Sequence, residues 1–239
     1  MDEEEIFLRV YRAKSWQKRA RACAKDGKKD LDGEFIFWWI ALNALYGQPR
    51  ERLEVRERYR RQNIDELHNI KDFLQDVSSS SHVGKALSDP HNPKKQNRDD
   101  VLENVFLRKE IWNQLSTTED LDSGTIWGSI EKTVEAANKN LKNGELGQYL
   151  KPIFEQLYVL RNQIIHGASK EQSRANRRSL TSAVPVLAEL VPVFIKAVED
   201  HGHNIRSDGI PYSPFKGKKS SKHPLLEQDF KGPPDFTGK

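Results

Sequence analysis

One histidine in this sequence combines a helical pattern with polar neighbours that suit proton and phosphate chemistry. His166 lies in the segment LYVLRNQIIHGASK, residues 157–170. Asn162 precedes it by four residues, which places both on one face of a helix. Arg161 lies about 140° around the same helix, and its long side chain can reach across the helix end. Because Gly167 is a typical helix terminator, the three side chains are predicted to converge near a helix C-terminus.

These side chain types suit phosphoryl transfer. The unpaired carbonyls at a helix C-terminus stabilise a protonated imidazole by about 0.3–1 kcal/mol, and a histidine near neutrality both gives and takes protons. Arginine binds phosphate through two hydrogen bonds, and asparagine can orient a hydroxyl or a phosphate oxygen. The alternative interpretation is structural: His166 and Asn162 cap helix carbonyls and Arg161 is a surface charge.

Basic residues near this segment could bind nucleic acid. Four of them follow the motif directly and are placed to guide RNA toward it: Lys170, Arg174, Arg177 and Arg178. Residues 50–61 carry six Arg against three Glu, a pattern that fits either contact with a phosphate backbone or a solvated helix with internal salt bridges.

The sequence predicts no metal site and no cofactor. His201 and His203 lack a carboxylate or thiolate ligand set nearby. Cys23 is the single cysteine, which excludes an intramolecular disulfide and a Cys-rich zinc site. Its spacing from Ala20 favours packing over nucleophilic chemistry.

Composition predicts a soluble globular protein. The chain has 239 residues, of which 36% are hydrophobic and 31% charged, with a mean hydropathy of −0.78. The net charge is +4, too small by itself to indicate a nucleic-acid binder. The N-terminus MDEEEIF is unlike a signal peptide, and the apolar run FIFWWIALNALY at residues 35–46 is shorter than the roughly 18–20 residues that span a bilayer. A cytoplasmic location without membrane contact is therefore predicted.

Apolar residues at spacings of three and four predict an all-α fold. The expected helices cover residues 4–25, 32–47, 65–77, 99–115, 124–141, 150–164 (beginning beside Pro152) and 180–198, the last bent by Pro185 and Pro192. Residues 78–98 are predicted to be a mobile loop or insertion within a helical domain over residues 1–203. The Pro/Gly/Lys-rich residues 204–239, with a net charge of +3, are predicted to form an extended or disordered basic tail.

Three segments resemble the HEPN superfamily (higher eukaryotes and prokaryotes nucleotide-binding). RNQIIHG at residues 161–167 resembles the Arg-Asn variant of its Arg-x4-His motif. FWWIALNALYG at 37–47 is similar to its second helix, and RSLTSAVPVLAELVPVFIKAVED at 178–200 is similar to the helix after the motif in bacterial Apea-like proteins. The resemblance covers most of residues 30–215.

The resemblance implies a HEPN-type bundle of about five to seven helices that forms a homodimer. Arg161, Asn162 and His166 of both subunits would line one cleft. In catalytic members, the 2′-hydroxyl of RNA attacks the adjacent phosphate without a metal and leaves a 2′,3′-cyclic phosphate and a 5′-hydroxyl. Arg161 would hold the phosphate, His166 would transfer a proton, and Asn162 would position the ribose or the histidine. Asn43 would face the cleft or be an amide satisfied at a helix interface.

The resemblance suggests an endoribonuclease that acts as a toxin or as an effector of a defence system, with an antitoxin or another partner protein. A non-catalytic HEPN module that binds RNA, a nucleotide or a protein partner is the first alternative. The second is a dimeric scaffold whose interface contains Trp38 and Trp39. Because Arg161 and His166 are both present, catalysis is the favoured hypothesis.

Overall fold

The part of the chain that the structure describes is entirely helical. The structure is a computed structural model, and it describes residues 1, 3–24, 30–46, 66–89, 92, 94–104, 107, 123–166 and 174–205. Within these residues there are eight α-helices, no strand and a final 3-10 turn: α1 (Glu3–Ala22), α2 (Leu31–Tyr46), α4 (Glu66–Val77), α5 (Ser81–Ser88), α6 (Lys95–Glu103), α8 (Ser123–Lys142), α9 (Leu146–Ile165), α10 (Arg174–His201) and η2 (Gly202–Asn204). The all-α prediction is confirmed. The basic tail from residue 206 onward lies outside the described residues.

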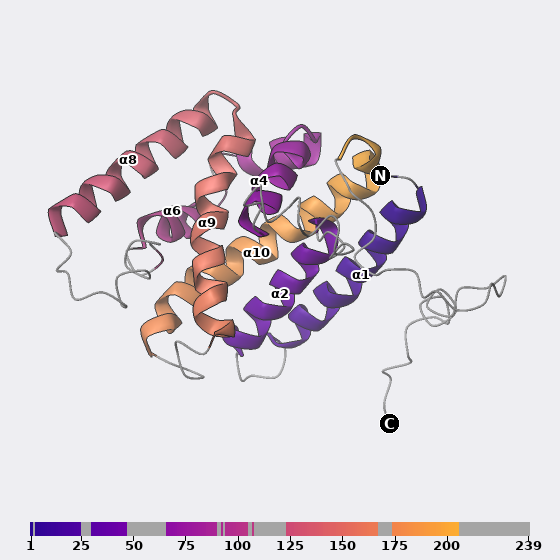
Figure 1. The fold of residues 1–239 in the computed structure, drawn as a ribbon, viewed down its shortest axis with the longest axis horizontal. Helices are drawn as coiled ribbons and strands as arrows, with labels where there is room; N and C mark the ends of the chain where they lie inside the picture. The colour runs from indigo at the N-terminus through magenta and orange to yellow at the C-terminus, as the bar shows by residue number, and fades with distance from the viewer. Residues whose placement is uncertain are drawn as a thin grey trace, which may run out of the picture.

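Two antiparallel helix pairs flank the long helix α10. The helices α1 and α2 form one pair, and α8 and α9 form the other on the opposite side of the molecule (Figure 1). Between the pairs, α10 contacts α1, α2, α4, α5, α6 and α9. Its residues Leu187, Val191 and Phe194 are fully buried. The ring of Phe194 packs against Phe73 of α4 and Phe154 of α9 at 5.9 and 5.8 Å between centroids, so one side chain joins three helices.

The apolar character of α10 also bears on membrane location. Asn176–Asn204 is long and apolar enough to cross a membrane by length and composition, and 61% of its apolar window is buried inside the structure. Helices that are apolar on most sides occur in protein cores as well as in bilayers. The burial of this helix is compatible with a soluble protein.

Two helix predictions need correction. Residues 78–98 were predicted to be a loop, but they contain α5 and the beginning of α6. The Ser80 hydroxyl accepts a hydrogen bond from the His82 backbone N–H at the start of α5. Val83 and Leu87 are buried and attach this helix to the core. The helix predicted to begin beside Pro152 begins earlier, at Leu146, so this proline lies inside α9. The helix α5 was not predicted because its two buried residues are too few to give a clear helical period in the sequence.

A buried ion pair ties α6 to α10. Arg98 is completely buried and donates from Nη1 to Glu189 at 2.7 Å and from Nε to the hydroxyl of Tyr149 on α9 at 3.1 Å. Asn92 donates to the second oxygen of Glu189 at 2.6 Å. Glu189 thus accepts two hydrogen bonds while its charge is compensated by the guanidinium.

We expect Glu189→Leu to lower the free energy of unfolding by about 3–5 kcal/mol, because it leaves the Arg98 charge buried without its partner. Urea denaturation followed by circular dichroism measures the change. The double substitution Arg98→Met with Glu189→Leu removes both charges and should cost much less. Equal losses in the single and double variants would contradict the explanation.

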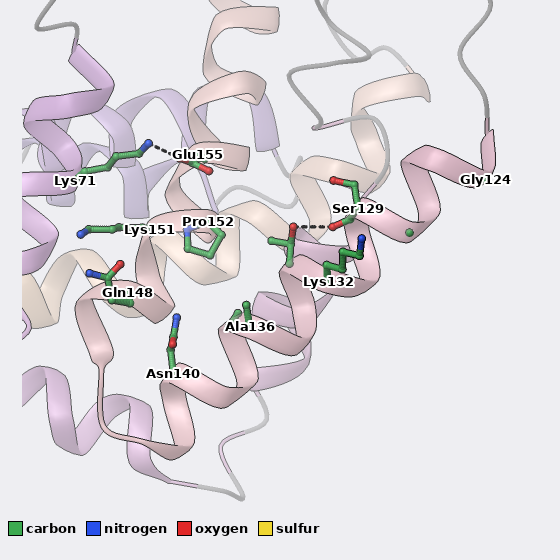
Figure 2. A pocket seen from close by; sticks show the side chains of 13 residues that line it. Lys71, Gly124, Ser129, Lys132, Ala136, Asn140, Gln148, Lys151, Pro152 and Glu155 are labelled. Carbon is green, nitrogen blue, oxygen red and sulfur yellow. Dashed lines mark hydrogen bonds and ion pairs between the residues drawn. The ribbon is translucent and has the colours of Figure 1, made fainter.

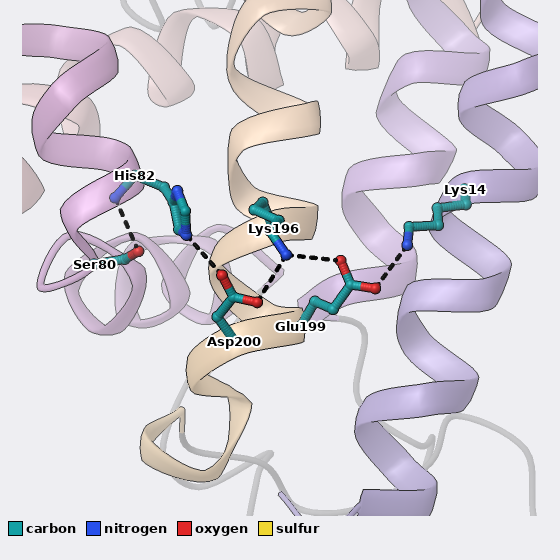
Figure 3. Close-up of polar contacts among 6 residues, drawn as sticks. All are labelled: Lys14, Ser80, His82, Lys196, Glu199 and Asp200. Carbon is teal, nitrogen blue, oxygen red and sulfur yellow. Dashed lines mark hydrogen bonds and ion pairs between the residues drawn. The ribbon is translucent and has the colours of Figure 1, made fainter.

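A second group of ion pairs joins the end of α10 to α1 and α5 at the surface (Figure 3). Asp200 contacts Lys196 at 2.9 Å and the Nε2 atom of His82 at 2.7 Å. Glu199 contacts Lys14 at 2.8 Å and Lys196 at 3.5 Å. The hydrogen bond from Lys14 is the main cause that lowers the pKa of Glu199, and that from Lys196 is the main cause that lowers the pKa of Asp200.

These lowered pKa values predict a pH dependence of stability. The carboxylates stabilise the folded state above the unfolded-state values of about 4, and the contribution disappears as pH falls through the lower folded-state values. Asp200→Asn and Glu199→Gln should therefore reduce the urea midpoint at neutral pH, with a smaller difference from wild type at about pH 3. A difference of the same size at both pH values would argue against these ion pairs.

Candidate functional site

The candidate site lies where the C-terminal part of α9 meets the beginning of α4 and the end of α2. His166 is the residue that ends α9, and its backbone N–H donates to the Asn162 carbonyl at 3.0 Å. Gly167, predicted to terminate the helix, lies outside the described residues. The helix end places Arg161, Asn162 and His166 within its last two turns, as the sequence pattern predicts.

The guanidinium of Arg161 is held by three neighbours. Its Nη1 atom donates to Oδ1 of Asn162 at 2.9 Å, and its Nη2 atom lies 3.3 Å from a carboxylate oxygen of Glu66 on α4. Its central carbon lies 5.8 Å from the ring centroid of Tyr158, within the range of a cation–π contact. The buried Nε atom has no hydrogen-bond partner among the described residues. Since the side chain is only 20% exposed, these contacts restrict its direction.

The carboxylate of Glu66 links Arg161 to α2. Its other oxygen accepts a hydrogen bond of 3.2 Å from the hydroxyl of Tyr46, the last residue of α2. Burial, together with the charge of Glu66, raises the pKa of Tyr46 well above its ordinary value, so the phenol remains a donor. Tyr46, Glu66, Arg161 and Asn162 therefore form one hydrogen-bonded series across three helices.

The structure does not bring every predicted residue into this series. The His166 side chain is exposed, and its ring makes no hydrogen bond or ion pair with any described residue. Asn43 is exposed on α2, so it is not an amide buried at a helix interface. Trp38 and Trp39 are each 2% exposed and belong to the core, so a scaffold interface built from these two tryptophans is wrong.

Three of the four basic residues that follow the motif lie at the start of α10. Arg174 begins this helix, Arg177 is half-buried and Arg178 is exposed. Lys170 lies outside the described residues. Arg174 follows His166 by eight positions along the chain, but no described contact joins Arg177 or Arg178 to His166.

Glu66 and Tyr46 are the members of the site that the sequence analysis missed. They are separated from Arg161 by about a hundred residues of chain, and neither belongs to the Arg-x4-His pattern. Their signal in the sequence is weak: a carboxylate at a predicted helix start and an aromatic residue at a predicted helix end. Only the tertiary packing of α2, α4 and α9 shows that they meet.

Comparison of the chain with protein-family models, with curated proteins and with solved structures found no match. Among the described residues, no group of three or more His, Cys, Asp or Glu side chains could hold a metal ion. The pocket that the described residues form between α8 and α9 contains none of the predicted site residues. The chemistry of the site therefore depends on the side chains around Arg161 and His166.

The arrangement can bind an anion and transfer a proton at neighbouring positions. A phosphate at Arg161 would have to share the guanidinium with Glu66 or displace this carboxylate, which accepts from both Tyr46 and Arg161. The exposed imidazole of His166 at the helix end is accessible to a substrate. The site thus combines a restrained cation with an accessible acid or base.

We expect Tyr46→Phe to lower the free energy of unfolding by about 1–2 kcal/mol, because Glu66 loses a buried donor. Thermal and urea unfolding of Tyr46→Phe, Glu66→Gln and the double variant give the coupling between the two side chains. Tyr158→Phe is the matched control, since it removes a hydroxyl but keeps the ring beside Arg161. Additive losses in the double variant would mean that the two side chains do not stabilise each other.

Proposed function

We propose that the chain is a HEPN-type endoribonuclease that cleaves RNA without a metal and acts as a homodimer in the cytoplasm. The observation that carries the proposal is the restrained guanidinium of Arg161 beside Asn162, five residues before the exposed imidazole of His166 on one helix. A phosphate-binding cation and a titratable imidazole are the two groups that cleavage by a neighbouring hydroxyl requires.

The proposed reaction uses only groups of the RNA and of the protein. The 2′-oxygen forms a bond to the adjacent phosphorus as the bond from phosphorus to the 5′-oxygen breaks. The proton of the 2′-hydroxyl passes to a base, and the departing 5′-oxygen gains a proton, which gives a 2′,3′-cyclic phosphate and a 5′-hydroxyl. His166 transfers one of these protons, Arg161 stabilises the phosphoryl charge, and Asn162 positions the ribose or the imidazole.

A second subunit fits this proposal. Within one subunit, no described contact joins the His166 ring to the Arg161 guanidinium. The half-buried Phe37 of α2 stacks on Trp16, which is 38% exposed, at 5.8 Å between centroids. Beside His166, Ile165 is 50% exposed. A second copy that covered Ile165 would place two sets of Arg161, Asn162 and His166 near one interface, and the Trp16–Phe37 stack offers a further exposed apolar surface.

The contact with Glu66 favours one alternative function. Because this carboxylate already pairs with Arg161, the guanidinium could serve to fix the fold of a non-catalytic HEPN module. Such a module would bind RNA, a nucleotide or a protein partner without cleaving it. If the chain does cleave RNA, we propose that it is a toxin or a defence effector restrained by an antitoxin or another partner protein, since free ribonuclease activity harms a cell.

We expect His166→Ala and Arg161→Ala each to reduce cleavage of single-stranded RNA by about 100-fold or more in EDTA, because general acid–base catalysis and charge stabilisation each contribute on that scale. Gel analysis of labelled RNA measures the rate, and the resistance of the new 3′ ends to enzymes that need a free 3′-hydroxyl reports the cyclic phosphate. His201→Ala, which changes an exposed histidine at the end of α10, is the matched control.

Three outcomes would change the proposal. Cleavage that survives in His166→Ala, or that requires a divalent metal, would overturn the mechanism. A folded dimer that binds RNA but cleaves none would support the non-catalytic module. A monomer by sedimentation, with full activity, would remove the second subunit from the site.

A further inference from the structure

A pocket of about 1030 Å³ that is open to solvent lies between α8 and α9, with Lys71 of α4 at one side. Figure 2 shows Lys71 of α4 and Lys151 of α9 on one side and Lys132 of α8 on the other, with Gln148 beside Lys151 and Asn140 in the lower part of the view. Its size is that of a site for a small organic molecule or for a few units of a polymer.

The charge of this pocket is positive. Glu155 is the one carboxylate that lines it, and this residue forms an ion pair with Lys71. Lys151 donates to the neutral amide of Gln75 at 3.1 Å, so its charge is not compensated by that contact. Lys132 is exposed and has no ion pair with any described residue. Two ammonium groups therefore remain available for an anion.

The remaining lining favours a hydrophilic ligand. Small residues on α8, including Gly128 and Ala136, keep the pocket open, and a side chain carbon added at Gly128 would meet no atom within 4 Å. None of the lining residues is aromatic, so the pocket offers no surface on which a base could stack. Phosphate groups fit this combination of ammonium and amide donors.

Part of the pocket lining and the candidate residues Asn162 and His166 lie on one face of α9, whereas Arg161 lies about 140° around the helix from His166. At 100° per residue, five side chains fall within an arc of about 80°: Gln148, Pro152, Glu155, Asn162 and His166. At 1.5 Å per residue, Lys151 lies about 22 Å from His166 along the helix axis. An extended polymer along this face could therefore reach both places.

We propose that this pocket is a subsite for the phosphate backbone of single-stranded RNA whose cleaved bond lies at His166. The subsite rests on the proposed endoribonuclease function. Lys132 and Lys151 contact phosphates a few nucleotides from the cleaved bond, and the amide of Asn140 donates to a phosphate oxygen, whereas the amide of Gln148 already donates to Gln75 at 3.4 Å. Because the pocket offers no aromatic ring, it adds affinity without base preference.

The test measures binding separately from cleavage. A fluorescein-labelled 2′-O-methyl oligoribonucleotide of about 12 nucleotides cannot undergo attack by a 2′-hydroxyl and is long enough to span both places. Fluorescence anisotropy over a range of salt concentrations gives its affinity. We expect Lys132→Ala with Lys151→Ala to weaken binding on the order of tenfold and to reduce the slope of log K against log salt by about 1.4, since each single-strand phosphate contact contributes about 0.7.

Two controls test whether loss of the pocket lysines causes the weaker binding and the smaller salt slope. Lys18→Ala with Lys85→Ala removes the same charge from exposed lysines of α1 and α5 and should change the slope much less. A 2′-O-methyl trinucleotide is too short to span the distance, so the pocket substitutions should not change its ability to inhibit cleavage at the His166 site. Equal effects of the two lysine pairs on the longer oligonucleotide would overturn the subsite.

The outcomes also separate this inference from the proposed function. If wild-type protein cleaves natural RNA but the pocket substitutions leave the slope unchanged, the nuclease proposal stands and the subsite is wrong. If no RNA is cleaved but the slope falls as expected, the pocket binds the backbone in a non-catalytic module.

Discussion

Burial of the apolar surface of α10 is the constraint on which the rest of the fold depends. This helix contacts six other helices, and residues such as Leu187 and Phe194 have no exposed surface. A fully buried aromatic or aliphatic side chain contributes roughly 1.5–3 kcal/mol, so a helix with so many of them directs the packing of its neighbours. The polar partners follow from this arrangement, since burying α6 against α10 requires that Arg98 meet Glu189.

The candidate site depends on a similar coupling of distant elements. Arg161 is directed by Glu66, and Glu66 is in turn held by Tyr46, so the position of the guanidinium depends on the packing of α2 and α4 against α9. The same carboxylate that orients Arg161 competes with a phosphate for it. If a phosphate can displace Glu66 from Arg161, this helix end can act as a catalytic site. If it cannot, the ion pair is a structural connection between α4 and α9.

The sequence predicts those parts of the structure that depend on local pattern. The helices α2, α4, α8 and α10 have several apolar residues at helical spacing, and their predicted ranges overlap the observed ones. Two other helix predictions need correction. The helix α5 has only Val83 and Leu87 as buried positions, and α9 begins before Pro152, the proline expected near its start. The contact of Arg161 with Asn162 joins two residues of one helix through the long arginine side chain, but the contact of Arg161 with Glu66 requires knowledge of tertiary packing. The lysines of the α8–α9 pocket lie on three helices and form no motif.

The hydrogen bond between Tyr46 and Glu66 also determines which substitutions could affect the candidate site from a distance. It joins the last residue of α2 to the first residue of α4, and both are far from Arg161 in the sequence. Because Glu66 directs the Arg161 guanidinium, a substitution that shifts either of these helix ends would turn this cation without changing any residue of α9. The function of one helix end is therefore exposed to mutation in two other helices.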